Sequence, residues 1–259
     1  MWILWSSCSN ISHDTKNALR DTVFQKNTIK QTPPKIIYDI SLSYEQQQNI
    51  ESMVNGYFCQ YPCDMKILTI GLSNIADKEN TTTLAHAKPH CIYLNEKDIS
   101  NDIALKNTII HELFHTIKPD TITYIQPYQL KDWYTVIWYH GLSVVVQKWK
   151  EKTQFGLFED AAAEACATTY NKEYSVPNVY YANIWSLLLK MINKWRCTVN
   201  DLIAYQSNNG MELFIEKIIN KKPTHKNIEI LMQIFNDVYS TEEDKTNEAI
   251  KKIETIRMK

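Results

Sequence analysis

The residues with the clearest capacity for chemistry are two histidines and a glutamate in the run His111-Glu112-Leu113-Phe114-His115. Residues four positions apart lie one turn apart on the same face of an α-helix, so both imidazoles can reach one metal ion. Zinc binds imidazole nitrogen at about 2.0–2.1 Å, and a catalytic zinc site has three protein ligands and an open position for water. The pattern therefore predicts one zinc ion per chain, with His111 and His115 as two of its ligands.

Glu112 follows the first histidine and is the candidate catalytic residue. A carboxylate beside the metal can take a proton from a metal-activated water and pass it to a leaving amine. The metal assists because it lowers the pKa of that water toward about 7. The competing interpretation is a buried helix whose two histidines are satisfied by structural hydrogen bonds.

Residues 108–116 resemble the active-site helix of the zincin metallopeptidases. In the gluzincin branch of that family, a later helix supplies a Glu ligand, followed by an acidic residue that orients one histidine. The matching segment here is 156–167, in which Asp160 and Glu164 stand four positions apart on one helix face. Asp stands where the family usually has Glu, so the helix must come closer to the metal. The resemblance implies Asp160 as the third ligand, with Glu164 and Glu159 as alternative ligands or partners of the histidines.

The same resemblance implies a Tyr or His that stabilises the oxyanion during hydrolysis. His140 and Tyr139 are the main candidates, and Tyr134 and Tyr170 are further ones. The sequence does not choose among them, because each is equally suited to packing in the core.

Two segments before the histidine motif offer binding roles. Zincins commonly have a sheet whose edge strand runs beside the active-site helix and binds substrate as an extra strand. The resemblance implies that role for residues 91–95, with an ordinary core strand as the alternative. His86, Lys88 and His90 lie in a predicted loop, where they form either a second metal site or a polar surface.

Hydrophobic periodicity predicts the elements that position these residues. Ser43 and Gln46 fit a capping box at the start of a helix. Residues 119–158 are irregular and aromatic, and within them 134–149 fit a hairpin or a helix. The aromatic stretch 124–149 either lines a cleft for apolar side chains or fills the core. The other predicted elements are strands at 36–38, 66–72 and 91–94, a loop at 73–90, helices at 100–117 and 158–174, and an almost wholly helical stretch from 179 to 258 with breaks near 208–210 and at Pro223.

These elements predict an α+β fold that is mostly helical, with a small mixed sheet beside the active-site helix. Only 5 glycines occur in 259 residues, which disfavours a turn-rich barrel or sandwich. We expect three parts: a tail or linker over 1–35 that is a candidate signal remnant, a zincin-like catalytic part over 36–178, and a helical C-terminal part over 179–259 that packs on it.

The chain ends and the composition bear on location and partners. Residues 2–9 resemble the end of a bacterial lipoprotein signal with Cys8 as the lipid-anchor site, although their apolar stretch is shorter than the roughly 7–15 residues of a signal. This favours the bacterial cell envelope or secretion over the cytoplasm. A Cys59–Cys63 disulfide would require export. The net charge of −1 indicates no nucleic-acid partner, and no stretch reaches the about 20 apolar residues of a transmembrane span.

The function we expect is a zinc-dependent peptidase, a hydrolase acting on a peptide or protein substrate. Two alternatives stay open. One is a degenerate zincin that binds a peptide or protein partner without cleaving it, as the Asp at position 160 suggests. The other is an interaction protein in which the motif is accidental. Glu112 favours the enzyme, because a structural zinc site needs no base and has four protein ligands.

Overall fold

The first of two sheets contains three parallel strands and one antiparallel edge strand. The computed structural model describes residues 32–61, 65–72, 85–95, 102–119, 123–125, 135–148, 151–171, 182–239 and 245–258, and Gln31–Lys259 forms one compact unit. The first sheet has the order β1 (Lys35–Tyr38), β2 (Ile67–Leu72), β4 (Cys91–Leu94) and β3 (Ala85–Lys88), with β3 antiparallel to β4. The strands predicted at 36–38, 66–72 and 91–94 are confirmed.

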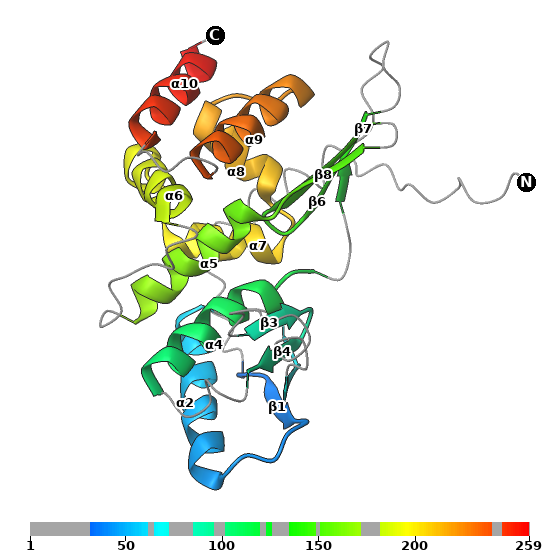
Figure 1. Ribbon diagram of the computed structural model, residues 1–259, viewed down its shortest axis with the longest axis vertical. Coiled ribbons are helices and arrows are strands. Elements are labelled where there is room, and N and C mark those ends of the chain that lie inside the picture. The colour runs from blue at the N-terminus through cyan, green and yellow to red at the C-terminus, as the bar shows by residue number, and fades with distance from the viewer. Residues whose placement is uncertain are drawn as a thin grey trace, which may run out of the picture. The chain divides into compact units, whose positions relative to one another are not determined.

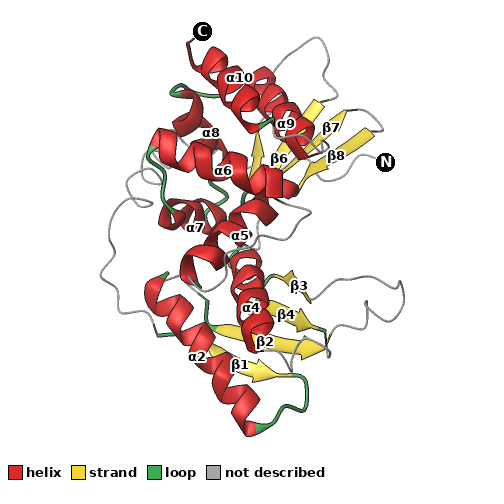
Figure 2. Ribbon diagram, turned by 60° about the vertical axis from the view of Figure 1, so that its left-hand side comes forward, coloured by secondary structure: helices red, strands yellow, loops and turns green. Residues whose placement is uncertain are grey.

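Two helices lie on one side of this sheet, α2 (Tyr44–Gln60) and α4 (Asp102–Thr116), as Figure 2 shows. Successive side chains of a strand point to opposite faces, so the sheet buries alternate residues such as Leu68 and Ile70. Neighbouring Ile67 is 48% exposed on the other face. The predicted capping box of Ser43 and Gln46 is present at the start of α2.

The prediction of a loop over 73–90 is wrong for its last part. Residues 85–88 form β3, which returns to β4 through a turn in which His90 has a φ of 61°. The strand was missed because Ala-His-Ala-Lys carries no large apolar residue. β4 therefore pairs on both sides, and β3 is the strand at this edge of the described sheet, so the edge-strand role predicted for 91–95 is also wrong.

The second sheet is antiparallel and lies within the stretch predicted to be irregular. Its strands are β5 (Thr123–Ile125), β6 (Thr135–His140), β7 (Ser143–Lys148) and β8 (Glu151–Phe155), in that order. The hairpin interpretation of 134–149 is confirmed. Gly141 and Leu142 form its two-residue turn, and Gly141 has a φ of +64°, which glycine adopts without steric cost.

The remaining described elements are helices (Figure 1). They are α5 (Leu157–Tyr170), α6 (Ala182–Trp195), α7 (Val199–Ser207), α8 (Met211–Ile219), α9 (His225–Tyr239) and α10 (Thr246–Met258). The breaks near 208–210 and at Pro223 are confirmed. A further break before α7 was not predicted, although Thr198 and Asp201 form a capping box there.

Helix α5 joins the two halves of the described unit, because it packs against α4 on one side and against α6 and α7 on the other. The expected fold class, α+β and mostly helical with a small mixed sheet, is confirmed. The predicted tail boundary at 35 is too late, since Lys35 already pairs with Ile67 in β1. Cys8 and Cys63 lie outside the described residues. Among the described helices, none has the length and apolar character needed to cross a membrane.

Candidate metal centre

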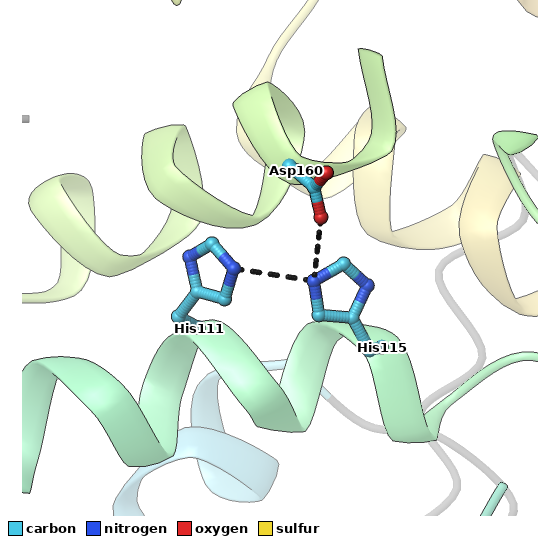
Figure 3. Close-up of side chains that lie close together, drawn as sticks. All are labelled: His111, His115 and Asp160. Carbon is cyan, nitrogen blue, oxygen red and sulfur yellow. Dashed lines mark hydrogen bonds and ion pairs between the residues drawn. The ribbon is translucent and has the colours of Figure 1, made fainter. Parts of the chain in front are cut away.

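Two facing helices bring the predicted ligands together. His111 and His115 lie one turn apart on α4, and Asp160 comes from the first turn of α5 across from them (Figure 3). His115 Nε2 is 3.2 Å from His111 Nε2 and 3.3 Å from Asp160 Oδ1. All three ligand atoms lie within 4.8 Å of one another. In the described part of the chain, this is the only group of three or more such side chains that could hold a metal ion.

Two of the three separations among these atoms fit a tetrahedral zinc site. A zinc ion with bonds of about 2.0–2.1 Å at tetrahedral angles holds its ligand atoms about 3.3–3.4 Å apart. The separations from His115 Nε2 to the other two ligands, 3.2 and 3.3 Å, are close to that value. The shorter Asp side chain at position 160 therefore reaches the histidines, because α4 and α5 pack directly against each other.

A carboxylate holds the second nitrogen of each histidine. His111 Nδ1 donates to Glu164 Oε2 at 3.1 Å, and His115 Nδ1 donates to Glu159 Oε1 at 2.6 Å. With the proton on Nδ1, each neutral ring presents the lone pair of Nε2. Two lone pairs and the Asp160 carboxylate then face one another, an arrangement that a cation, an added proton or a donating water relieves. This donor set fits zinc, and such carboxylate partners fix the orientation of ligating histidines.

Glu159 has three donors on one oxygen. Its Oε1 accepts from His115 Nδ1 at 2.6 Å, from Lys118 Nζ at 2.6 Å and from Gln206 Nε2 at 2.8 Å. Burial raises the pKa of Glu159, but the hydrogen bonds and charges of His115 and Lys118 outweigh it and lower the pKa to about 2. Glu159 is therefore ionised at neutral pH and acts as a partner of His115 instead of a metal ligand.

The electrostatics of the cluster favour a positive charge at its centre. Burial lowers the pKa of His115, but the negative charges of Glu159, Glu112 and Asp160 outweigh burial and raise it. Burial also raises the pKa of Asp160, against the opposing effect of the two histidines. A proton and a metal ion therefore compete for the same place, so that metal binding displaces a proton and a fall in pH weakens metal binding.

The three candidate ligands are reachable from solvent, whereas their carboxylate partners are not. The side chains of His111, His115 and Asp160 are 17%, 14% and 29% exposed. Those of Glu164 and Glu159 are only 7% and 4% exposed. A site with three protein ligands that is open on one side has room for water or substrate, which is the arrangement of catalytic zinc sites.

Glu112 lies next to the cluster on α4, the helix that packs against β3 and β4. Glu112 is 8% exposed. Its carboxylate makes no hydrogen bond or ion pair with the other described residues. Its negative charge acts to raise the pKa of Asp160 on α5 and of His86 on β3. Glu112 is thus a buried carboxylate close to both the candidate ligands and the edge strand.

The tyrosines proposed as oxyanion stabilisers have contacts elsewhere. Tyr139 is fully buried in β6, and burial together with the charge of Glu212 raises its pKa well above the usual range. The ring of Tyr170 packs on Tyr57 of α2, with centroids 6.2 Å apart. Tyr134 lies outside the described residues. These contacts assign Tyr139 and Tyr170 to packing.

The predicted histidine candidates outside the motif are also engaged. His140 Nε2 donates to the carbonyl of Pro119 at 2.9 Å, just after the end of α4. The ring of His86 stacks on Tyr93 at 4.7 Å, and Lys88 Nζ lies 5.4 Å from the same ring. Two of the three residues proposed for a second metal site, His86 and Lys88, therefore cover an aromatic side chain on the sheet.

Sequence reasoning missed two residues that contact Glu159, namely Lys118 and Gln206. Gln206 is completely buried in α7, beside the buried apolar residues Leu202 and Tyr205. A polar residue on an apolar helix face is the one signal that could have drawn notice to it, because buried amides need partners. Nothing in the sequence indicated which partner it has.

The comparisons with known proteins returned no relative. No family model matches the chain, and no match was found among the curated proteins or the solved structures. The function must therefore be argued from the site itself.

Proposed function

We propose that this chain is a zinc-dependent peptidase of the zincin type. The observation that carries the proposal is the pair of facing helices. They bring the ligand atoms of His111, His115 and Asp160 within 4.8 Å of one another, while Glu159 and Glu164 hold the outer nitrogens of the histidines. Ligands with such partners are typical of built metal sites and are not expected of an accidental motif.

Glu112 supplies the acid–base chemistry. A zinc ion in this site would polarise the substrate carbonyl and lower the pKa of a neighbouring water. Glu112 would accept a proton from a water whose oxygen bonds to the carbonyl carbon, and it would deliver that proton to the leaving amine as the C–N bond breaks. Its place on α4 next to His111, and a charge that raises the pKa of Asp160, support this role.

The acidic pair of α5 keeps both roles that the gluzincin pattern implies, which favours the peptidase over a degenerate relative. Asp160 stands where that pattern usually has Glu, and Glu164 stands at its second acidic position. The shorter Asp160 takes the place of the ligand, and the longer Glu164 takes the place of the histidine partner. This arrangement keeps one carboxylate toward the metal position and one toward His111 Nδ1. Both functions of the acidic pair are thereby retained.

The first test is the metal content of protein purified without added metal and without a histidine tag. We expect about one zinc per chain, and a sharp fall in Asp160→Ala but not in the matched control Asp39→Ala, which alters an exposed acid outside the site. Zinc retained by Asp160→Ala would move the third ligand to another acid. Wild-type protein that binds no zinc, even after incubation with it, would contradict the proposal.

The second test is hydrolysis of a mixed peptide library, followed by mass spectrometry. Glu112→Gln should retain zinc and lose at least about 100-fold of the activity, since general acid–base catalysis contributes 10²–10⁴-fold. Zinc-loaded wild type that cleaves nothing would favour the alternative in which the protein binds a peptide without cutting it.

A further inference from the structure

We propose that Gln206 is a positioning residue of the metal centre, by which the C-terminal helices hold Glu159, and through it His115, in place. This inference rests on the proposed function. Gln206 Nε2 donates to Glu159 Oε1 at 2.8 Å and to the carbonyl of Phe114 on α4 at 3.2 Å. Its Oε1 accepts from the backbone N–H of Leu142 at 2.7 Å. One side chain of α7 therefore connects α4, α5 and the turn of the β6–β7 hairpin.

The three partners determine how the amide of Gln206 is oriented. Two of them, Glu159 Oε1 and the carbonyl of Phe114, only accept hydrogen bonds, and the third, the N–H of Leu142, only donates. Turning the amide over would set oxygen against two acceptors and the NH₂ group against a donor. The side chain is completely buried, so water does not compete for these bonds. Gln206 thus holds Glu159 in one position.

Lys118 does not provide the same constraint, although it also contacts Glu159. A lysine is a point charge on a flexible stem, and it can follow a carboxylate that moves. Gln206 is held at its other end by the hairpin, and it cannot follow. Since Glu159 orients the ring of His115 through a 2.6 Å hydrogen bond, the direction of the His115 lone pair depends on Gln206.

The hairpin turn is shaped around this glutamine. A Cβ on Gly141 would lie 2.4 Å from Gln206 Oε1, so a larger residue would push the amide away. The N–H of Gly141 is held separately, by Asn209 Oδ1 at 2.6 Å. Asn209 contacts the same turn without contacting Glu159, which makes it a control for effects that act only through the hairpin.

The test compares two substitutions of Gln206 with Asn209→Ala. At a pH at which its new carboxyl is ionised, Gln206→Glu keeps an acceptor for Leu142 and replaces the donor to Glu159 by a second acceptor. Gln206→Met removes all three bonds. The zinc affinity is measured by competition with a chromophoric chelator, and the ligand geometry by the visible absorption of the cobalt(II) protein. Both Gln206 variants should bind zinc roughly tenfold more weakly, the low end for partners of metal ligands. Their cobalt bands should shift, while Asn209→Ala keeps the wild-type spectrum.

The cobalt spectrum reports on the ligands, so a purely structural role for Gln206 would leave it unchanged in folded protein. Because Gln206→Met can fail to fold, Gln206→Glu carries the comparison, with circular dichroism as the check on folding. Wild-type affinity and spectrum in folded Gln206→Glu would overturn this inference and leave the proposed function standing. Wild-type protein that binds neither zinc nor cobalt would overturn both.

Discussion

The interface between α4 and α5 differs from the packing of helices α8 and α9 in the kind of residues that each buries. The buried polar residues of α4, α5 and the position just after α5 are Asn107, Thr108, Glu112, Thr116, Glu159, Glu164 and Asn171. The buried residues of α8 and α9 are all apolar: Met211, Phe214, Ile215, Ile218, Ile219, Ile228, Leu231, Met232, Ile234, Phe235 and Val238.

This difference separates the helices that stabilise the fold from the interface that carries the candidate metal site. Burying apolar surface contributes roughly 25 cal/mol per Å², whereas burying a polar group costs free energy unless it finds a partner. Within the described residues, Glu164 Oε1 and Asn107 Nδ2 are buried without one. The α4–α5 interface therefore holds groups that disfavour folding, and the apolar helices offset that cost.

Zinc should have the largest effect on the free energy of unfolding, and it should act on the polar α4–α5 interface alone. A ligand that binds only the folded state adds about 4 kcal/mol to the free energy of unfolding at a free concentration 1,000-fold above its Kd. Urea unfolding with zinc and with chelator measures the difference. His115→Ala should abolish it, since that variant lacks a ligand. An equal zinc effect in this variant would place the binding site elsewhere.

Leu231→Ala should cause the next largest change in the free energy of unfolding, and it should leave the zinc affinity unchanged. Leu231 is completely buried in α9, and removing such a side chain costs about 2–5 kcal/mol. The zinc affinity of the folded variant should equal that of the wild type, since no polar contact changes. Ile230→Ala is the matched control, because Ile230 is 37% exposed and should cost under about 1 kcal/mol. Weaker zinc binding by folded Leu231→Ala would contradict the claim that packing in α9 and the candidate metal site act independently.

Acidification should weaken the polar interface through Glu159. Its pKa is lowered from 4.5 to about 2 in the folded protein, so its ionised form stabilises the fold above about pH 4.5. This contribution, at most about 3 kcal/mol, is lost as the pH falls toward 2. Metal-free Glu159→Gln should therefore lose less stability than metal-free wild type when the pH falls from about 6 to about 3. Parallel curves in urea unfolding would contradict this assignment.

The smallest change in the free energy of unfolding should come from the pair of amide side chains, Asn171 and Asn107, at the far end of the α4–α5 interface. Asn171 Nδ2 donates to Asn107 Oδ1 at 2.8 Å, between the segment after α5 and helix α4. Asn171→Ala leaves the Asn107 amide buried and unpaired, at a cost of about 1–3 kcal/mol. The double substitution with Asn107→Ala should cost less than the sum of the two single ones. Additive costs would show that the two amides act independently.

The parts of the site that the sequence predicts are those with local spacing. His111 and His115 are four positions apart, and helix geometry alone brings them together. Asp160 required the register of a second helix, and only the resemblance to zincins suggested it. The contacts of Gln206 with Phe114 and Glu159 span 92 and 47 positions, which no local pattern encodes. The metal and the substrate stay predictions.

The fold shows the same division. The helices and the strands of large apolar residues follow from periodicity, and the structure confirms them. The strand Ala85–Lys88 lacks that signal, because its place in the sheet is set by pairing with β4. The turn at Gly141 was predicted only as one of two alternatives, since the aromatic residues around it suit a strand and a helix equally well.

The position of Gln206 in the chain has a consequence for biosynthesis. A ribosome makes α4 and α5 before α7, so the nascent chain carries the histidine motif well before the residue that steadies it. A chain released early, or cut ahead of Val199, would keep the metal ligands and lack this support. The contacts that hold Glu159 and His115 in place at the candidate metal site would then be complete only after α7 has been made.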